Sequence, residues 1–193
     1  MKSKTVVIYP GRFQPFHRGH AAIYAEMEKY FPNADRWIAT SGKVDVNSPF
    51  NFEERKTLAV LSGIPGDFVV EVKNPYIASE ILANYDPKKD RVIFVISKKD
   101  VDRLKFGIKK DGSPTYLQEW HQNVEMQPFD IKNGHAYVVV MPIFQFEVLG
   151  KTITSASEIR NMLRDPAFKK TLLINLYGEN GFVQSDNIIG KYF

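Results

Sequence analysis

The sequence contains no cysteine. This absence excludes disulfide bonds, thiolate zinc sites and a cysteine nucleophile, and it is typical of a protein from a reducing compartment. No apolar run approaches the roughly 20 residues that span a membrane. Residues Met1–Lys4 precede an apolar run that is too short for a signal-peptide core and has no small-residue cleavage site. We therefore expect a cytoplasmic protein without a membrane partner.

Several common catalytic signatures are also absent. The chain has no Gly-x-x-x-x-Gly-Lys phosphate loop and no Ser, His and Asp set whose spacing favours a catalytic triad. His121 and His135 lack metal-ligand spacing, so we predict no metal site built from protein side chains. Internal repeats and low-complexity segments are missing as well.

The net charge of +4 is unevenly distributed along the chain. Residues 86–110 hold nine basic and four acidic residues, which accounts for the whole excess of positive charge. Such a segment either steers anionic ligands such as nucleotides or forms an ordinary mixed-charge surface. Because acids interrupt the bases and no nucleic-acid-binding signature is present, we do not expect a nucleic acid as partner.

Apolar, β-branched runs alternate with helical patterns. Continuous apolar runs are typical of strands that are buried on both faces of a sheet. The alternation predicts an α/β fold, namely a Rossmann-like parallel five-stranded sheet with helices on both faces and a C-terminal helical extension. The expected strands are residues 5–9, 37–40, 68–72, 92–96 and 137–142, and the expected helices are 20–30, 51–61, 77–84, 154–163 and 165–176.

The length of 193 residues predicts one domain, with a core of residues 4–163 and an extension of residues 164–193. Residues 105–130 are harder to interpret: a turn at Asp111–Pro114 precedes a pattern at Tyr116–Met126 that is compatible with a helix. The pattern of residues 178–193 favours no particular element.

The segment from Gly11 to His20 reads Gly-Arg-Phe-Gln-Pro-Phe-His-Arg-Gly-His and joins the first expected strand to the first expected helix. A helix N-terminus offers unpaired backbone N–H groups and a positive dipole end, which together attract anions. His17 and His20 can donate hydrogen bonds to a phosphate there, and Gly19 lets the backbone approach it. Alternatively, both histidines are helix-cap residues with satisfied hydrogen bonds.

This segment resembles the signature of the nucleotidyltransferase superfamily that carries the His-x-Gly-His motif. It is most similar to the branch of archaeal-type and bifunctional nicotinamide mononucleotide adenylyltransferases. The resemblance implies transfer of AMP from ATP, with Mg²⁺, to a small phosphorylated acceptor, nicotinamide mononucleotide, with release of pyrophosphate. It implies catalytic roles for His17, His20 and Arg160, and nucleotide binding by Gly11, Arg12, Phe13, Gly19, Ser155, Ser157 and Lys98.

A second motif, Thr154–Arg160, resembles the superfamily signature that closes over the triphosphate. Ser157 stands where threonine is usual and keeps the hydroxyl, and Arg160 keeps a fork of donors that suits phosphate oxygens. The alternative is a plain helix start, because Ser155 and Glu158 have the spacing of a capping box.

Two further segments are less specific. Residues 47–56 resemble a stretch of the same adenylyltransferase branch, with Asn51 and Glu54 as a capping box and Arg55 in a structural role. Lys98, Lys99 and Arg103 follow the fourth expected strand, where they contact phosphates or carry surface charge.

Several functions remain open at this point. One keeps the chemistry and changes the acceptor, or uses CTP as donor. Another is a non-catalytic nucleotide-binding or structural protein of the same fold. A class I aminoacyl-tRNA synthetase is disfavoured by the short chain and by the missing lysine-rich second signature. Assembly into a homo-oligomer is also left open.

Overall fold

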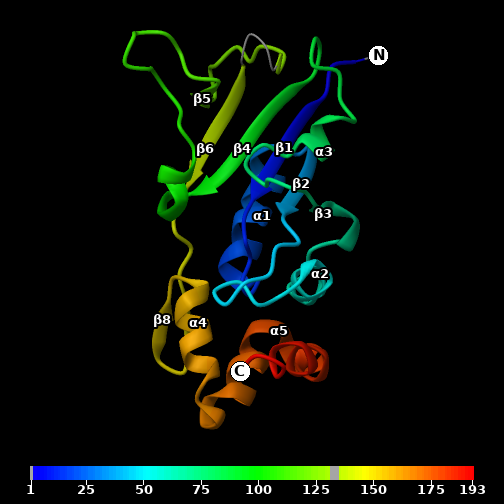
Figure 1. Ribbon diagram of the computed structural model, residues 1–193, viewed down its shortest axis with the longest axis vertical. Helices are drawn as coiled ribbons and strands as arrows, with labels where there is room; N and C mark the ends of the chain where they lie inside the picture. Colours follow the sequence, from blue (N-terminus) through cyan, green and yellow to red (C-terminus); the bar gives the residue numbers. More distant parts are fainter. Residues whose placement is uncertain (1, 131–134) are drawn as a thin grey trace.

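The computed structural model describes residues 2–130 and 135–193. Its centre is a six-stranded sheet in the order β3-β2-β1-β4-β6-β5, in which every adjacent pair is parallel (Figure 1). The fold is therefore the predicted Rossmann-like α/β fold, but with six strands in place of five. The strands are β1 (Thr5–Pro10), β2 (Asp35–Thr40), β3 (Val69–Glu71), β4 (Arg91–Ser97), β5 (Leu117–Glu119) and β6 (Ala136–Met141).

The central strands are buried on both faces. In β1, Val7 and Tyr9 belong to one hydrophobic cluster, while Val6 and Ile8 belong to another. Successive side chains of a strand point to opposite faces, so each cluster covers one face of the sheet. This burial explains why the strands appear in the sequence as continuous apolar runs rather than as alternating ones.

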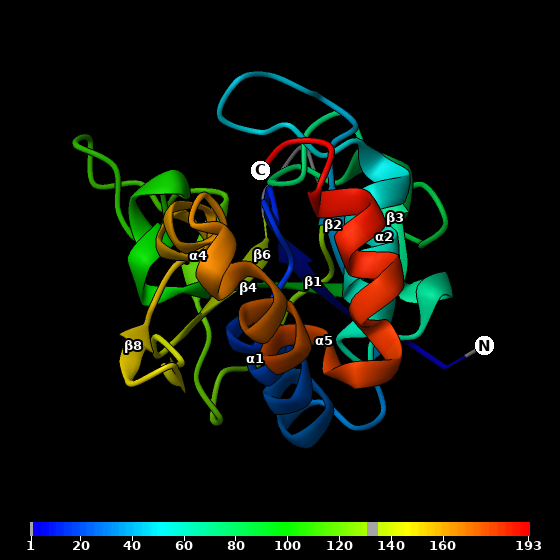
Figure 2. The ribbon, with the colours of Figure 1, turned by 90° about the horizontal axis from the view of Figure 1, so that it is seen from below.

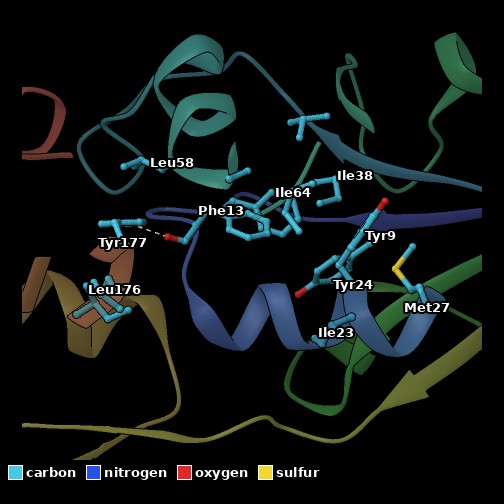
Figure 3. Packing of buried hydrophobic residues seen from close by; sticks show 14 of the residues in the cluster. Tyr9, Phe13, Ile23, Tyr24, Met27, Ile38, Leu58, Ile64, Leu176 and Tyr177 are labelled. Atoms are coloured by element: carbon cyan, nitrogen blue, oxygen red, sulfur yellow. Dashed lines mark hydrogen bonds between the residues drawn. The ribbon is translucent and has the colours of Figure 1, made fainter. Parts of the chain in front are cut away.

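Helices cover both faces, as predicted. The cluster around Tyr9 includes side chains from four helices, and Figure 3 shows Ile23, Met27 and Leu58 among them. The opposite cluster receives Ile81 and Leu82. The four helices are α1 (Arg18–Tyr30), α2 (Phe52–Leu61), α4 (Ala156–Leu163) and α5 (Pro166–Ile189), and the opposite face carries α3 (Ser79–Leu82). Two short 3-10 helices are η1 (Gly66–Phe68) and η2 (Lys98–Arg103).

The helix that the sequence pattern allows at residues 116–126 is not present. Leu117–Glu119 instead form the edge strand β5 beside β6. Leu117 is buried, and the next backbone N–H after the strand, that of Trp120, donates to the Val138 carbonyl at 2.8 Å. Three residues are too few to produce a recognisable period, so only the neighbouring strand defines this element. The helix expected at 77–84 is likewise shorter, and α3 has four residues.

A hairpin that the sequence did not reveal precedes α4. Strands β7 (Phe146–Val148) and β8 (Lys151–Ile153) pair antiparallel. Between them, Leu149 and Gly150 have φ angles of 53° and 71°. Two consecutive positive φ angles are typical of the tightest hairpin turns. The hairpin leads directly into the second motif.

The C-terminal segment α5 consists of two helical stretches with a break at Gly178. Pro166 occupies its first turn, as predicted, and the Asp165 side chain accepts a hydrogen bond from the Ala167 N–H at 3.0 Å. Gly178 bends the helix with a φ of 77°, which glycine adopts without steric cost. Helix α5 thereby packs against both α4 and α2 (Figure 2). The assignment of residues 164–193 as an extension of a single domain stays a prediction.

The strand order reverses between β1 and β4. The chain passes from β1 outward to β2 and β3, and it then returns to build β4 on the other side of β1. The carboxyl ends of these strands point toward α4 and α5 (Figure 1). In open parallel sheets, ligands bind in the crevice at such a reversal. Within the described part of the chain, none of the helices is both long and apolar enough to cross a membrane.

Candidate active site

A pocket of about 410 Å³ lies at the carboxyl ends of β1 and β4. Its walls come from the turn after β1, the loop after β3, the start of η2 and the N-terminal part of α4. The two sequence motifs, far apart in the chain, therefore meet at the strand reversal. The predicted site residues that line the pocket are Gly11, Arg12, Phe13, His17, Gly19, His20, Ser155, Ser157 and Arg160.

Lys98 is the exception among the predicted residues. Its side chain is exposed and it is not among the residues that line the pocket, whereas the adjacent Lys99 is. Successive residues of a helical turn point in different directions, so only one of two neighbouring lysines at the start of η2 faces the pocket. Nucleotide binding by Lys98 therefore stays a prediction, and the structure places the adjacent Lys99 on the pocket wall.

The two histidines cap helix α1. His17 has an extended backbone as the N-cap residue, and its Nδ1 accepts a hydrogen bond from the Gly19 N–H at 3.1 Å. In return, the Nδ1 of His20 accepts from the His17 N–H at 3.2 Å. This is the geometry of a capping box, in which two imidazoles replace the usual hydroxyl and carboxylate. Both histidines are therefore helix caps, and each ring uses its Nδ1 for the cap.

The cap also decides where each ring carries its proton. A backbone N–H can only donate, so both Nδ1 atoms are unprotonated acceptors and each neutral ring carries its hydrogen on Nε2. The Nε2 of His17 is buried and has no hydrogen-bond partner among the described residues. An unpaired buried donor costs about 1–3 kcal/mol. Its position in a pocket wall is typical of a group that binds a ligand.

Burial keeps both rings neutral. It lowers the pKa of His17 to about 3, with the positive charge of Lys99 adding to the effect and Glu158 opposing it. The pKa of His20 is also well below its ordinary value, because of burial first and then because of His17 and Lys99. The two ring centroids are 3.7 Å apart. At neutral pH the pair therefore offers two Nε2–H donors without an imidazolium charge.

The turn before the histidines is tightly packed. Phe13 has a φ of 48°, an uncommon conformation for a bulky residue, and its ring contacts Tyr9 and His20 with centroids 5.2 and 5.0 Å away. A Cβ atom at Gly11 would lie 2.6 Å from this ring, so only glycine fits there without displacing Phe13. Backbone strain of this kind is concentrated at ligand sites.

Helix α4 brings Arg160 to the opposite wall. The helix begins with the predicted capping box, since the Glu158 carboxylate accepts from the Ser155 N–H at 2.8 Å and the Ser155 Oγ accepts from the Glu158 N–H at 3.4 Å. Arg160 donates to the Gln14 carbonyl from one terminal nitrogen and to the Ser157 Oγ, at 3.1 Å, from the other. Burial, followed by the nearby Arg12, lowers its pKa from the ordinary arginine value.

The lining has an excess of positive charge. It includes Arg12, Lys99, Arg103 and Arg160, while Asp100 is the acidic side chain among the described lining residues. Asp100 is paired with Arg103 at 2.7 Å. A concave surface with uncompensated positive charge favours an anionic ligand. The described residues contain no group of three or more His, Asp or Glu side chains that could hold a metal ion.

Sequence reasoning missed Tyr76 and Gln14. Tyr76, from the loop after β3, lines the pocket and accepts a hydrogen bond from Arg103 at 3.2 Å. Nothing in its local pattern points to the site, because only the sheet topology brings it there. Gln14 lies inside the first motif but binds the backbone of Phe50 rather than a ligand.

Arg55 has the structural role that the sequence predicted. It is almost fully buried, and it donates to the Phe50 carbonyl at 2.7 Å and to the carbonyls of Ser41 and Lys43. These bonds hold both ends of the loop that joins β2 to α2. Asn51 and Glu54 form the predicted capping box at the start of α2.

Comparison with solved structures shows a shared fold. Nicotinic acid mononucleotide adenylyltransferase from Plasmodium falciparum matches with a TM-score of 0.56 in its complex with NaAD and 0.52 in its complex with APC. In both cases the identity is 14%, with 98% of this chain and 96% of the other covered. A bifunctional NMN adenylyltransferase/ADP-ribose pyrophosphatase from Francisella tularensis is 18% identical, with a TM-score of 0.45 over 97% of this chain and 50% of the other.

The family follows from the sequence match. No curated protein matches the chain. The model of the cytidylyltransferase-like family matches residues 8–162, a range that contains both motifs and every strand from β2 to β8. The chain therefore belongs to the cytidylyltransferase-like family of nucleotidyltransferases.

Proposed function

We propose that this protein transfers AMP from ATP to nicotinamide mononucleotide, forming NAD and releasing pyrophosphate. The observation that carries the proposal is the pair of neutral imidazoles at the N-terminus of α1, with the Nε2–H of His17 left unpaired in a positively charged pocket. Family membership supports nucleotidyl transfer. The resemblance of the first motif supports AMP and this acceptor. The structural neighbours named as nicotinic acid mononucleotide adenylyltransferases agree with adenylyl transfer but carry a different acceptor in their name.

The reaction requires charge stabilisation at the α-phosphate. A phosphate oxygen of the acceptor attacks the α-phosphorus, a new P–O bond forms, and the bond to the oxygen that leaves with pyrophosphate breaks. No covalent enzyme intermediate is needed, so the protein positions the groups and stabilises the developing charge. His17 and His20 donate from Nε2 to the α-phosphate oxygens. The positive end of α1 adds to this effect.

The second motif supplies the donors for the leaving group. Arg160 is held by Gln14 and Ser157, so its guanidinium is oriented before a ligand arrives. We assign it to the β- and γ-phosphates, with the hydroxyls of Ser157 and Ser155 assisting. Arg12 and Lys99 complete the positive lining toward the same phosphates. A fixed fork of donors suits phosphate oxygens because it needs little reorganisation during the reaction.

Magnesium enters this scheme as part of the substrate, MgATP. Asp100 is the carboxylate that the described residues place on the pocket wall, and no described cluster could enclose an ion. This donor set fits Mg²⁺ that is held by phosphate oxygens and water, which is a common arrangement for this ion. The ion neutralises charge on the triphosphate and on the departing pyrophosphate.

A substrate matrix tests the proposal. MgATP and MgCTP are each combined with nicotinamide mononucleotide, nicotinic acid mononucleotide and a panel of other phosphomonoesters, and pyrophosphate and dinucleotide are measured together. We expect NAD and pyrophosphate in equal amounts from MgATP and nicotinamide mononucleotide, at a higher kcat/KM than any other pair gives. Absence of turnover with this acceptor would refute the proposed acceptor, and faster reaction with CTP would refute the proposed donor.

A further inference from the structure

The last three residues of the chain, Lys191–Phe193, lie against the segment that enters α2. We call them the C-terminal strap. The ring of Tyr192 contacts that of Phe50 edge-on, with centroids 5.2 Å apart, and the Phe193 ring lies 6.2 Å from the same Phe50 ring. Phe50 is fully buried. Figure 2 shows the end of the chain beside the loop that precedes α2. The strap therefore covers a residue far from it in sequence.

Polar contacts fix the strap to Glu54. The Tyr192 hydroxyl donates to one carboxylate oxygen and the Lys191 ammonium to the other, each at 2.8 Å. The carboxylate also accepts from the Asn51 N–H at 3.0 Å, within the capping box of α2. Burial alone would raise the pKa of Glu54, but these three donors lower it below its ordinary value. Glu54 is therefore a charged, buried anchor for the strap.

Phe50 connects this anchor to the site. The Gln14 side chain donates to the Phe50 carbonyl and accepts from the Phe50 N–H, both at 3.0 Å and both buried. The backbone carbonyl of Gln14 in turn accepts from Arg160. Only Phe50 and Gln14 thus separate the strap from Arg160, and Gln14 lies three residues before His17.

Helix α5 also contacts the same turn directly. The Tyr177 hydroxyl, one residue before the bend at Gly178, donates to the Phe16 carbonyl at 2.7 Å (dashed line in Figure 3). The two halves of α5 therefore reach the histidine turn by different routes, one through Tyr177 and one through the strap.

We propose that the C-terminal strap is a positioning element of the active site. By holding Phe50 in place, it fixes Gln14 and thereby the donor geometry of His17 and Arg160. This inference rests on the proposed function for its catalytic consequence, but the structural coupling that it asserts is independent of any substrate. Tyr192 is in this sense a positioning residue, because its ring contact is with Phe50 and its hydrogen bond is with Glu54, and neither of these residues lines the pocket.

Native-state hydrogen exchange tests the coupling without a substrate. In the full chain, Tyr192→Ala removes both the ring contact and the hydroxyl, whereas Tyr192→Phe keeps the ring against Phe50. We expect Tyr192→Ala to speed exchange of the amides of residues 11–20 about tenfold, within the range of energetic coupling through packed networks. Exchange in β4 should not change, and Tyr192→Phe should restore most of the protection. Tyr30→Ala, at an exposed tyrosine of α1, is the matched control.

Kinetics give the second readout. We expect Tyr192→Ala to lower kcat/KM for MgATP about tenfold, and Tyr192→Phe to recover most of this loss. Unchanged exchange in residues 11–20 would overturn the inference even if the enzyme is active. Equal acceleration in β4 would also overturn it, because the strap would then serve only global stability. If the wild-type protein transfers no nucleotide, the proposed function fails, while the exchange data still decide the inference.

Discussion

His17→Asn is expected to lower the kcat of nucleotidyl transfer about 10²–10³-fold, which is the effect of removing one donor from a charge-stabilising site. Asparagine is one of the preferred N-cap residues, so the cap on α1 should be kept. What the variant lacks is the buried Nε2–H that has no partner among the described residues. The loss should therefore appear in kcat while the free energy of unfolding changes by less than about 1 kcal/mol.

His20→Ala should reduce kcat by a similar factor and should also remove one bond of the capping box. Steady-state kinetics and urea unfolding on the same preparations separate the two effects. His121→Asn is the control, because His121 is exposed and lies outside the pocket lining. Full activity of His17→Asn with an intact fold would show that the histidines serve only as caps.

Arg160→Lys is expected to lower kcat/KM for MgATP about 10²-fold, although the charge is conserved. Lysine cannot hold the Gln14 carbonyl, the Ser157 hydroxyl and a phosphate oxygen together, because it lacks the planar fork of donors. A site that needed only positive charge would tolerate the change. Arg160→Lys thus distinguishes a need for oriented donors from a need for positive charge alone.

Arg164→Lys provides the matched control for this prediction. Arg164 lies one turn further along, at the C-terminal end of α4, and its side chain is exposed. The two variants are compared in initial rates over a range of MgATP concentrations, with acceptor saturating. Equal activity of Arg160→Lys and Arg164→Lys would refute the assignment of Arg160 to the leaving phosphates.

The sequence predicts this fold well where the signals are local. Strand β1, the turn at Gly11–His20 and the start of α1 are encoded within 30 consecutive residues, so burial pattern, turn residues and cap appear together. The capping boxes at Asn51 and Ser155 are equally local and were predicted correctly. The same applies to Pro166 at the start of α5.

Other features depend on partners that are distant in the chain. Strand β5 exists because β6 offers a free edge, and its three residues carry no period of their own. Tyr76 joins the pocket beside Arg103, which donates to its hydroxyl from 27 positions further along the chain. Tyr192 contacts Glu54 across 138 positions, a separation that no local pattern can reveal.

The histidine pair shows a different limit of sequence reasoning. The sequence leaves helix cap and phosphate donor as alternative roles for the histidines. In the structure, a ring that caps the helix through one nitrogen can still donate to a phosphate from the other. The cap uses Nδ1 and thereby places the hydrogen on Nε2. The helix-cap and phosphate-donor interpretations are therefore compatible, because an imidazole ring has two nitrogens.

The pH dependence follows from the lowered histidine pKa values. Below about pH 6.5, histidine side chains in the unfolded chain bind protons, whereas the lowered pKa values keep His17 and His20 unprotonated in the folded protein. Their contribution to the free energy of unfolding is therefore complete above that pH, and it is lost as the pH falls toward the value of about 3 for His17. Between pH 6.5 and 8 the rings stay neutral. The pH profile of kcat/KM, which reports ionisations of the free enzyme, should therefore show no change from these two histidines in this range.

The protonation of the two histidines can be measured by NMR of the ring nitrogens of His17 and His20, followed from pH 8 to pH 5 with and without MgATP. We expect both rings to remain neutral with hydrogen on Nε2 throughout, and we expect MgATP to shift the Nε2–H signals of both. Titration of either ring near the ordinary histidine pKa, hydrogen on Nδ1, or Nε2–H signals that do not respond to MgATP would show that the two rings are not the phosphate donors.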